Sequence, residues 1–270
     1  MGLLARLYNC ISISDFGFKP YVHGTRKNQI HHHSRHILMN RFHHVFSHRH
    51  VVLPVIHVVD EEQSCRNAGI AREAGADGVF LINHDLSYTR LLDIHAAVVA
   101  DFSDWWVGVN CLDLDAVNVF KHIHVQVAGV WVDNALINEH SEHQTEAEKV
   151  LQAQKSQGWQ GLYFGGVAFK YQREVEDVVQ ASRTAVDYMD VVTTSGPGTG
   201  FAASIDKIRT MKQAIGAFPL AIASGITPEN VTDYLPISDC FLVATGISKR
   251  LDLLDARLTE RLIRTIRTPR

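Results

Sequence analysis

The feature that most constrains the fold is an alternation that begins at Val51 and repeats eight times. Short apolar, β-branched runs are followed by amphipathic stretches with a helical period. Such alternation is typical of strand–helix units that build a parallel sheet. The eight predicted strands are 51–59, 78–83, 105–110, 129–132, 161–164, 191–194, 220–223 and 241–243.

Glycines separate these units in a regular way. Gly75, Gly158 and Gly216 each end a predicted helix shortly before the next strand, as C-terminal capping glycines do. Eight such units predict a (β/α)8 or TIM barrel, similar to the ribulose-phosphate-binding barrels, and a barrel needs about 250 residues. The amphipathic stretch 251–266 fits its closing helix. An open doubly wound sheet is the alternative, but no GxGxxG turn follows the first strand.

Residues 1–38 precede the barrel and show no clear period. Nine of the 16 histidines fall in the first 50 residues. A histidine tract that binds metal is one interpretation, and an organelle-targeting segment is another. We predict instead a poorly ordered His-rich extension that buries no core, with Met39 as the start of a single barrel domain over 39–270.

Composition excludes several classes of protein. The net charge of -3 provides no basic footprint for nucleic acid. No apolar run is long enough to predict a membrane span. The cysteines are scattered without CxxC spacing, which predicts reduced thiols in a cytoplasmic protein rather than disulfides or a zinc site.

Three glycine-containing loops follow the last three strands, where barrels of this kind often bind phosphate. Glycine lets a phosphate approach backbone N–H groups, and Ser and Thr hydroxyls add donors. Thr227 and Pro228 suit the N-cap and first position of the next helix. A plain turn is the alternative for any single loop. The predicted phosphate-binding residues are Ser195, Gly196, Gly198, Thr199, Gly200, Ser224, Gly225, Thr245 and Gly246.

Polar side chains also follow the earlier strands, where catalytic residues of this fold usually lie. Asp133 would act as a general base if burial raised its pKa. Lys170 would neutralise phosphate, or form a Schiff base if desolvated. His57 lies in an apolar run, so a core histidine is an equal alternative for it. The predicted catalytic residues are Asp60, Asp85, Asn110, Asp133 and Lys170, with His57 and Asn83 as further pocket residues.

Asp113 and Asp115 follow the third strand. Their carboxylates are suitable ligands for Mg²⁺. They are equally suitable caps for the helix that follows, and we favour that role. We therefore predict no metal site and identify no cofactor, with Mg²⁺ as the one ion to consider.

The motifs, taken in order, resemble those of the BtpA family of α/β-barrel proteins over about 51–249. The motif at residues 224–231 is nearly the family's pattern as it stands. Phe169-Lys170-Tyr171 lies where the family has Val-Lys-His. The matching segments are Val55-Ile56-His57, residues 73–78, Gly108-Val109-Asn110 with Asp115-Ala116, Phe169-Lys170-Tyr171, residues 193–200 and residues 224–231.

The resemblance implies the barrel fold and, less specifically, a function. One cyanobacterial member is linked to biogenesis or stability of photosystem I, others sit among sugar-metabolism genes, and some are labelled phosphoribosylanthranilate isomerase. This chain departs from the family at Val58-Val59-Asp60-Glu61, where a Pro- and Gly-rich segment is usual, and at Tyr171, which replaces a histidine. The isomerase's cysteine after strand one is absent, and Ser195-Gly196 replaces its aspartate after strand six.

Two functions are consistent with these features. The first, which we favour, is an enzyme that acts on a phosphosugar or phosphoribosyl compound as an isomerase, lyase or transferase. Lys170 and the glycine loops would hold phosphate, Asp133, Asp60 or Asp85 would move protons, and Asn110 would orient the substrate. The second is a non-catalytic assembly or stability factor that retains the ligand pocket without turnover. The expected partners are a small phosphorylated ligand and, as in many barrels, a second copy of the chain.

Overall fold

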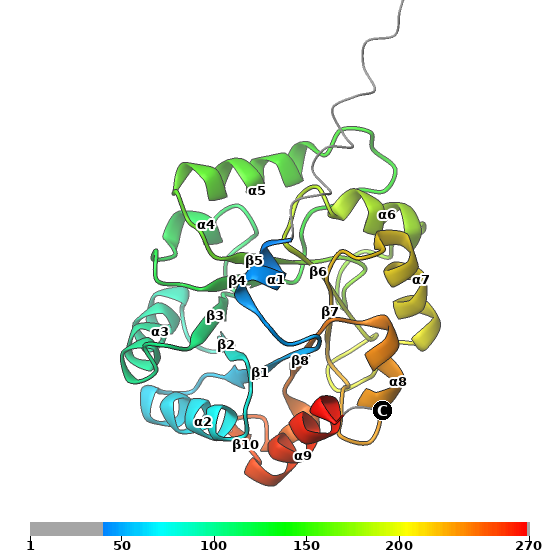
Figure 1. The fold of residues 1–270 in the computed structure, drawn as a ribbon. Helices are drawn as coiled ribbons and strands as arrows, with labels where there is room; N and C mark the ends of the chain where they lie inside the picture. Colours follow the sequence, from blue (N-terminus) through cyan, green and yellow to red (C-terminus); the bar gives the residue numbers. More distant parts are fainter. Residues whose placement is uncertain (1–39, 269–270) are drawn as a thin grey trace, which may run out of the picture. The chain divides into compact units, whose positions relative to one another are not determined.

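A computed structural model describes residues 40–268 of the chain, and residues 1–38 with most of the histidine tract lie outside this range. Eight parallel strands close into a barrel in sequence order, with β1 paired to β8 (Figure 1). The predicted barrel is therefore confirmed. The strands are β1 (Val51–His57), β2 (Gly78–Ile82), β3 (Trp106–Asn110), β4 (Gly129–Val132), β5 (Leu162–Gly166), β6 (Val191–Ser195), β7 (Leu220–Ala223) and β8 (Cys240–Val243).

A helix follows each strand and covers the outside of the barrel (Figure 1). Gly75, Gly158 and Gly216 have φ values of 87°, 61° and 61°, the left-handed conformation that ends a helix, as predicted. None of the helices within 40–268 has the length and apolar character needed to cross a membrane. The helices are α2 (Glu61–Glu73), α3 (Tyr88–Asp101), α4 (Val119–His122), α5 (Thr145–Ser156), α6 (Val178–Ala185), α7 (Ile205–Ile215), α8 (Val231–Tyr234) and α9 (Ala256–Arg267).

Several strand boundaries differ from the prediction by one or two residues, and the ends of β1 and α9 differ for a visible reason. β1 ends at His57, because the Gln63 side chain donates to the His57 carbonyl at 3.1 Å and accepts from the Val59 N–H at 3.2 Å. The closing helix α9 begins five residues late, because a small hairpin of β9 (Ser248–Arg250) and β10 (Leu253–Leu254) precedes it. Hydrogen bonds that the apolar pattern does not encode thus determine where β1 ends and where α9 begins.

Aromatic rings fill the interior of the barrel. Phe80 lies edge-on to Trp106 and to Phe164, with ring centroids 5.0 Å and 5.1 Å apart. Glycines make room for these rings, since a Cβ at Gly108 would lie 2.5 Å from Phe80 and a Cβ at Gly129 would lie 2.2 Å from Trp106. A large side chain at either glycine would therefore disrupt the core.

A short helix, α1 (Arg41–Val45), covers the N-terminal end of the barrel (Figure 1). Its Phe42 side chain is fully buried, 6.3 Å from the Phe164 ring, and Phe46 lies 5.4 Å from Trp106. Asn40 caps the helix by accepting from the Phe42 N–H at 2.8 Å. The barrel core therefore includes residues that precede β1.

Replacing Phe42 with alanine should lower the free energy of unfolding by about 3–5 kcal/mol, because it empties a buried aromatic site. Val45→Ala is the matched control on the same helix, since Val45 is half exposed. Chemical denaturation of both variants measures the difference. Equal, small effects of the two substitutions would show that α1 does not belong to the folded core.

Candidate functional site

The C-terminal ends of the strands bring the predicted polar residues to one end of the barrel. His57 ends β1, Asn110 ends β3 and Ser195 ends β6. Asp133 directly follows β4, and Lys170 lies in the loop after β5. Because all eight strands are parallel, these residues share one mouth, which is the end of this fold that carries active sites.

Lys170 connects three loops at this mouth. Its ammonium group donates to the Thr199 hydroxyl at 3.1 Å and to the Ser224 hydroxyl at 3.0 Å. Its backbone N–H donates to the Ser195 hydroxyl at 2.8 Å. Burial lowers the pKa of Lys170, and the Asp133 carboxylate acts in the opposite direction. A half-buried cation that contacts two hydroxyls is suited to receive an anion.

Asp133 is held by Asn110, whose side-chain amide donates to its carboxylate at 3.0 Å. Burial raises the pKa of Asp133, against the opposing effects of this hydrogen bond and of the Lys170 charge. Asn110 itself is buried, so its orientation is fixed. A positioned carboxylate with a raised pKa is suited to general base catalysis.

His57 and His84 form a stacked pair beside these groups. Their rings are nearly parallel with centroids 4.8 Å apart, and His57 Nδ1 lies 2.7 Å from His84 Nε2. Burial lowers the pKa of His57 to about 4, with further effects of His84 and Lys170. A neutral His57 can exchange a proton with its neighbour, because one ring nitrogen donates and the other accepts.

Three of the glycines predicted to bind phosphate have close backbone contacts. A Cβ at Gly196, Gly225 or Gly246 would lie 2.1, 2.2 or 1.9 Å from a backbone atom. These glycines therefore let the loops after β6, β7 and β8 pack tightly. Gly198 and Gly200 have more room, with the nearest atoms at 3.4 and 3.8 Å, so they are the more accessible to a ligand.

Backbone strain is concentrated at the same end. Four non-glycine residues among those described have positive φ, and all four lie in loops that follow strands. Such conformations cost of the order of 1–3 kcal/mol each and cluster at functional sites. The four are Leu136 (φ 62°), Ala168 (φ 48°), Tyr171 (φ 60°) and Ser224 (φ 83°), of which two flank Lys170 and one contacts it.

Three predicted residues make no hydrogen bond to Lys170 within residues 40–268. Asp60 is exposed and caps α2, accepting from the Gln63 N–H at 2.8 Å. Asp85 is exposed and has no hydrogen bond within residues 40–268. Asn83 is buried and donates to the Leu86 carbonyl at 2.7 Å. Within the described chain, the hydrogen bonds of Asp60 and Asn83 stabilise the loops after β1, β2 and β3.

Asp113 and Asp115 both act as hydrogen-bond acceptors in loops. Asp115 accepts from the Val117 and Asn118 N–H groups in the turn before α4, whose N-cap residue is Asn118. Asp113 instead accepts from the Tyr88 N–H at 2.8 Å, at the start of the preceding helix α3. Among the described residues, no group of three His, Cys, Asp or Glu side chains could hold a metal ion.

Lys207 on α7 is part of the site although we did not predict it. Its ammonium group donates to the carbonyls of Ala168 and Ser195, the latter at 2.8 Å. Burial lowers its pKa to about 8. Lys207 therefore connects two segments, the one that precedes Lys170 and the end of β6. Its spacing of four from the buried Met211 was the available signal, since it places Lys207 beside the buried face of the helix.

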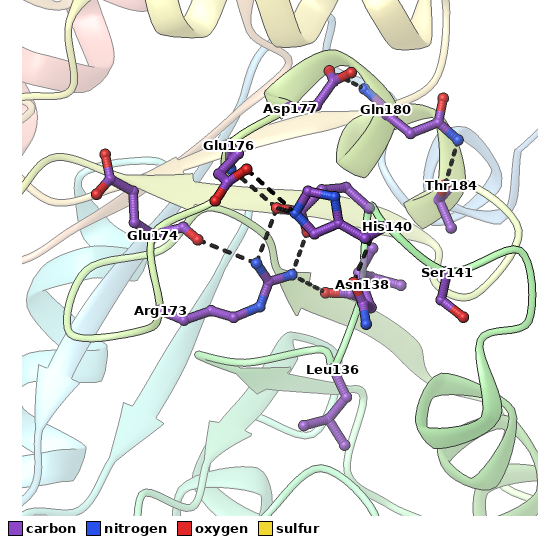
Figure 2. Close-up of polar contacts among 12 residues, drawn as sticks. Leu136, Asn138, His140, Ser141, Arg173, Glu174, Glu176, Asp177, Gln180 and Thr184 are labelled. Atoms are coloured by element: carbon purple, nitrogen blue, oxygen red, sulfur yellow. Dashed lines mark hydrogen bonds and ion pairs between the residues drawn. The ribbon is translucent and has the colours of Figure 1, made fainter.

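An ion pair between Arg173 and Glu139 connects the loop after β5 to the loop after β4. Figure 2 shows the Arg173 side chain beside the segment that carries Asn138 and His140. Arg173 donates to both oxygens of the buried Glu139 carboxylate and to the Ile137 carbonyl at 3.0 Å. Arg173 holds the pKa of Glu139 at about 2. This pair therefore restrains the two loops that carry Asp133 and Lys170.

A separate cavity of about 500 Å³ lies away from this mouth. Its lining includes His50, which precedes β1, together with Leu235, Ile266 and Arg267. None of the predicted site residues lines it. The candidate site is therefore defined by converging polar groups and not by this cavity.

Comparison with known proteins identifies the family. A model of the BtpA family matches residues 54–267, a range that includes every predicted site residue. The chain belongs to the BtpA family. The resemblance seen in the ordered motifs is therefore confirmed, and no curated protein sequence matches the chain.

Solved structures share the barrel of this BtpA family chain at low sequence identity. Phosphoribosyl anthranilate isomerase from Thermus thermophilus has a TM-score of 0.54 and 14% identity, covering 80% of this chain and 98% of that one. (S)-3-O-geranylgeranylglyceryl phosphate synthase from Thermoplasma acidophilum, in complex with sn-glycerol-1-phosphate, has a TM-score of 0.58 and 16% identity, covering 84% and 96%. A structure described as native KDPGal has a TM-score of 0.58 and 13% identity, covering 80% and 94%. At such low identities, the structural similarity shows a shared fold and nothing more.

The depressed pKa of His57 predicts a pH dependence. Between pH 6.5 and about 4 the unfolded chain takes up a proton at His57 that the folded chain does not, so stability falls as the pH falls through this range. The free energy of unfolding should therefore fall over that range by about 2–3 kcal/mol less in the His57→Gln variant than in the wild type. Denaturation at several pH values measures this, and an NMR titration of His57 centred near 6.5 would contradict it.

Proposed function

We propose that this chain is an enzyme that acts on a phosphosugar or phosphoribosyl compound as an isomerase, lyase or transferase. The observation that carries the proposal is the position of Lys170, which contacts hydroxyls of two other loops. Asp133 and Asn110 lie at the same mouth. The site thus combines a place for an anion with a group suited to proton transfer.

The phosphate of the ligand would bind between Lys170, Thr199 and Ser224. Its oxygens would accept the hydrogen bonds that Lys170 now gives to the two hydroxyls, and the hydroxyls would turn to donate to phosphate. The names of two proteins that share this fold, a phosphoribosyl anthranilate isomerase and a synthase in complex with sn-glycerol-1-phosphate, support a phosphorylated ligand.

Proton transfer would fall to Asp133. Asn110 fixes one of its oxygens, and the raised pKa keeps the carboxylate basic enough to remove a proton. The His57–His84 pair would then carry a proton along the edge of the site. Asp60 and Asp85 would have lesser roles, because neither contacts these groups within residues 40–268.

Further predictions belong to the same proposal. The carboxylates of Asp113 and Asp115 are already occupied as hydrogen-bond acceptors. We therefore propose that Mg²⁺, where it takes part in the reaction, binds together with the phosphate of the ligand. The free thiols of Cys65, Cys111 and Cys240 support a cytoplasmic location. The prediction that the chain pairs with a second copy and binds no nucleic acid rests on sequence and fold class.

Lys170→Met should weaken binding of a phosphosugar about 10- to 100-fold, the usual effect of losing a hydrogen bond to a charged group. Lys149→Met, which removes an exposed lysine on α5, should leave binding unchanged. Calorimetric titration of the full chain with a panel of phosphosugars and phosphoribosyl compounds measures both. Gly225 and Gly246 are unsuitable for this test, because substitution there would disturb loop packing. Absence of binding by any phosphorylated compound to the folded wild type would overturn the phosphate site.

Asp133→Asn separates catalysis from binding. The amide keeps an acceptor for Asn110 but is not basic, so turnover should fall by about 10²-fold or more while ligand affinity stays within a few-fold. Product analysis after incubation with the bound compound measures turnover. Binding without turnover of any bound compound by the wild type would favour the assembly or stability factor instead.

A further inference from the structure

Apolar side chains surround the polar mouth of the barrel. Among the described residues, seven large apolar side chains are exposed, and five of these lie in loops that follow strands. Only Val45 on α1 and Val125 before β4 lie elsewhere. The five at the mouth are Val59, Leu112, Tyr171, Phe201 and Leu251. A polar centre with an apolar rim suits a ligand that has both characters.

Tyr171 is the most exposed of these five, at 75%. Its backbone has φ 60°, a conformation that a bulky residue adopts only where its surroundings impose it. Its hydroxyl accepts from the Thr199 N–H at 3.3 Å, and the Lys170 ammonium lies 5.9 Å from its ring centroid. The ring is therefore fixed in solvent between the lysine and the glycine-rich loop.

Phe201 lies in the loop after β6, directly after Gly200, and is 66% exposed. Both aromatic side chains border Gly198, since a Cβ there would lie 3.4 Å from the Phe201 ring and 3.5 Å from the Tyr171 hydroxyl. Gly198 leaves this gap open, because it has no side chain to fill it. Two exposed rings thus flank the segment that carries Thr199.

We propose that the ligand carries a planar aromatic ring close to its phosphate, and that this ring packs on Tyr171 and Phe201 while the phosphate meets Lys170. The inference rests on the proposed phosphate site and names the class of its ligand, a nucleotide-like or aryl phosphoribosyl compound. Stacking on tyrosine and phenylalanine tolerates many ring systems, because each has an apolar face. Exposure of both rings is explained by the ligand that covers them.

Adenosine 5′-monophosphate and ribose 5-phosphate form the test pair, since they share a phosphorylated ribose and differ in the ring. Calorimetric titration of the full chain should show about tenfold tighter binding of the nucleotide. Equal affinities, or tighter binding of ribose 5-phosphate, would overturn the proposal and leave the phosphate site intact. No binding of either compound or of inorganic phosphate would overturn the proposed function and this inference together.

Tyr171→Gly separates ligand binding from folding. Glycine adopts positive φ without strain, so the variant should melt no lower than the wild type. It should lose about tenfold in affinity for adenosine 5′-monophosphate and stay within twofold for ribose 5-phosphate. Tyr171→Phe keeps the ring and should bind the nucleotide within threefold of the wild type.

Phe201→Ala and Val125→Ala complete the test. Phe201→Ala should also weaken nucleotide binding selectively. Val125→Ala, which changes an exposed apolar residue outside the mouth, should have no effect on either compound. A Tyr171→Gly variant that binds the nucleotide as tightly as the wild type, or that weakens both compounds equally, would overturn the role of the rings.

Discussion

Closure of the sheet between β1 and β8 is the constraint on which the rest of the structure depends. Val51 pairs with Cys240, and the register continues to Pro54 and Val243. A closed parallel barrel has no free edge, and its interior must be filled by side chains. Aromatic rings over Gly108 and α1 at the N-terminal end meet that need. The C-terminal end is thereby left for polar groups.

The electrostatics of that end favour an anion. Lys170 and Lys207 are both half buried, and burial lowers the pKa of each. Lys170 has Asp133 nearby, whereas Lys207 contacts only carbonyl groups within the described chain. A bound phosphate would offset the cost of keeping both lysines charged in a partly desolvated site.

The fold was more predictable from the sequence than the site. Strand positions and the glycines that end α2, α5 and α7 follow from local periodicity and capping. The roles of Gly225 and Gly246 do not, because a glycine needed for a close loop contact and one needed for a ligand look the same in sequence. Lys207 and the His57–His84 pair depend on distances between separate units, which no local pattern encodes.

The segment Phe169-Lys170-Tyr171 shows how one loop divides these tasks. Phe169 is buried against Trp131 in the barrel, with ring centroids 5.9 Å apart, Lys170 is half buried at the centre of the mouth, and Tyr171 faces solvent. Such rapid alternation requires the strained φ values of Ala168 and Tyr171. Where the family motif has a histidine, this chain has Tyr171, which points outward and supports no core packing. A change at that position is therefore compatible with the same barrel core, and under the proposed function it would alter the surface that meets the ligand.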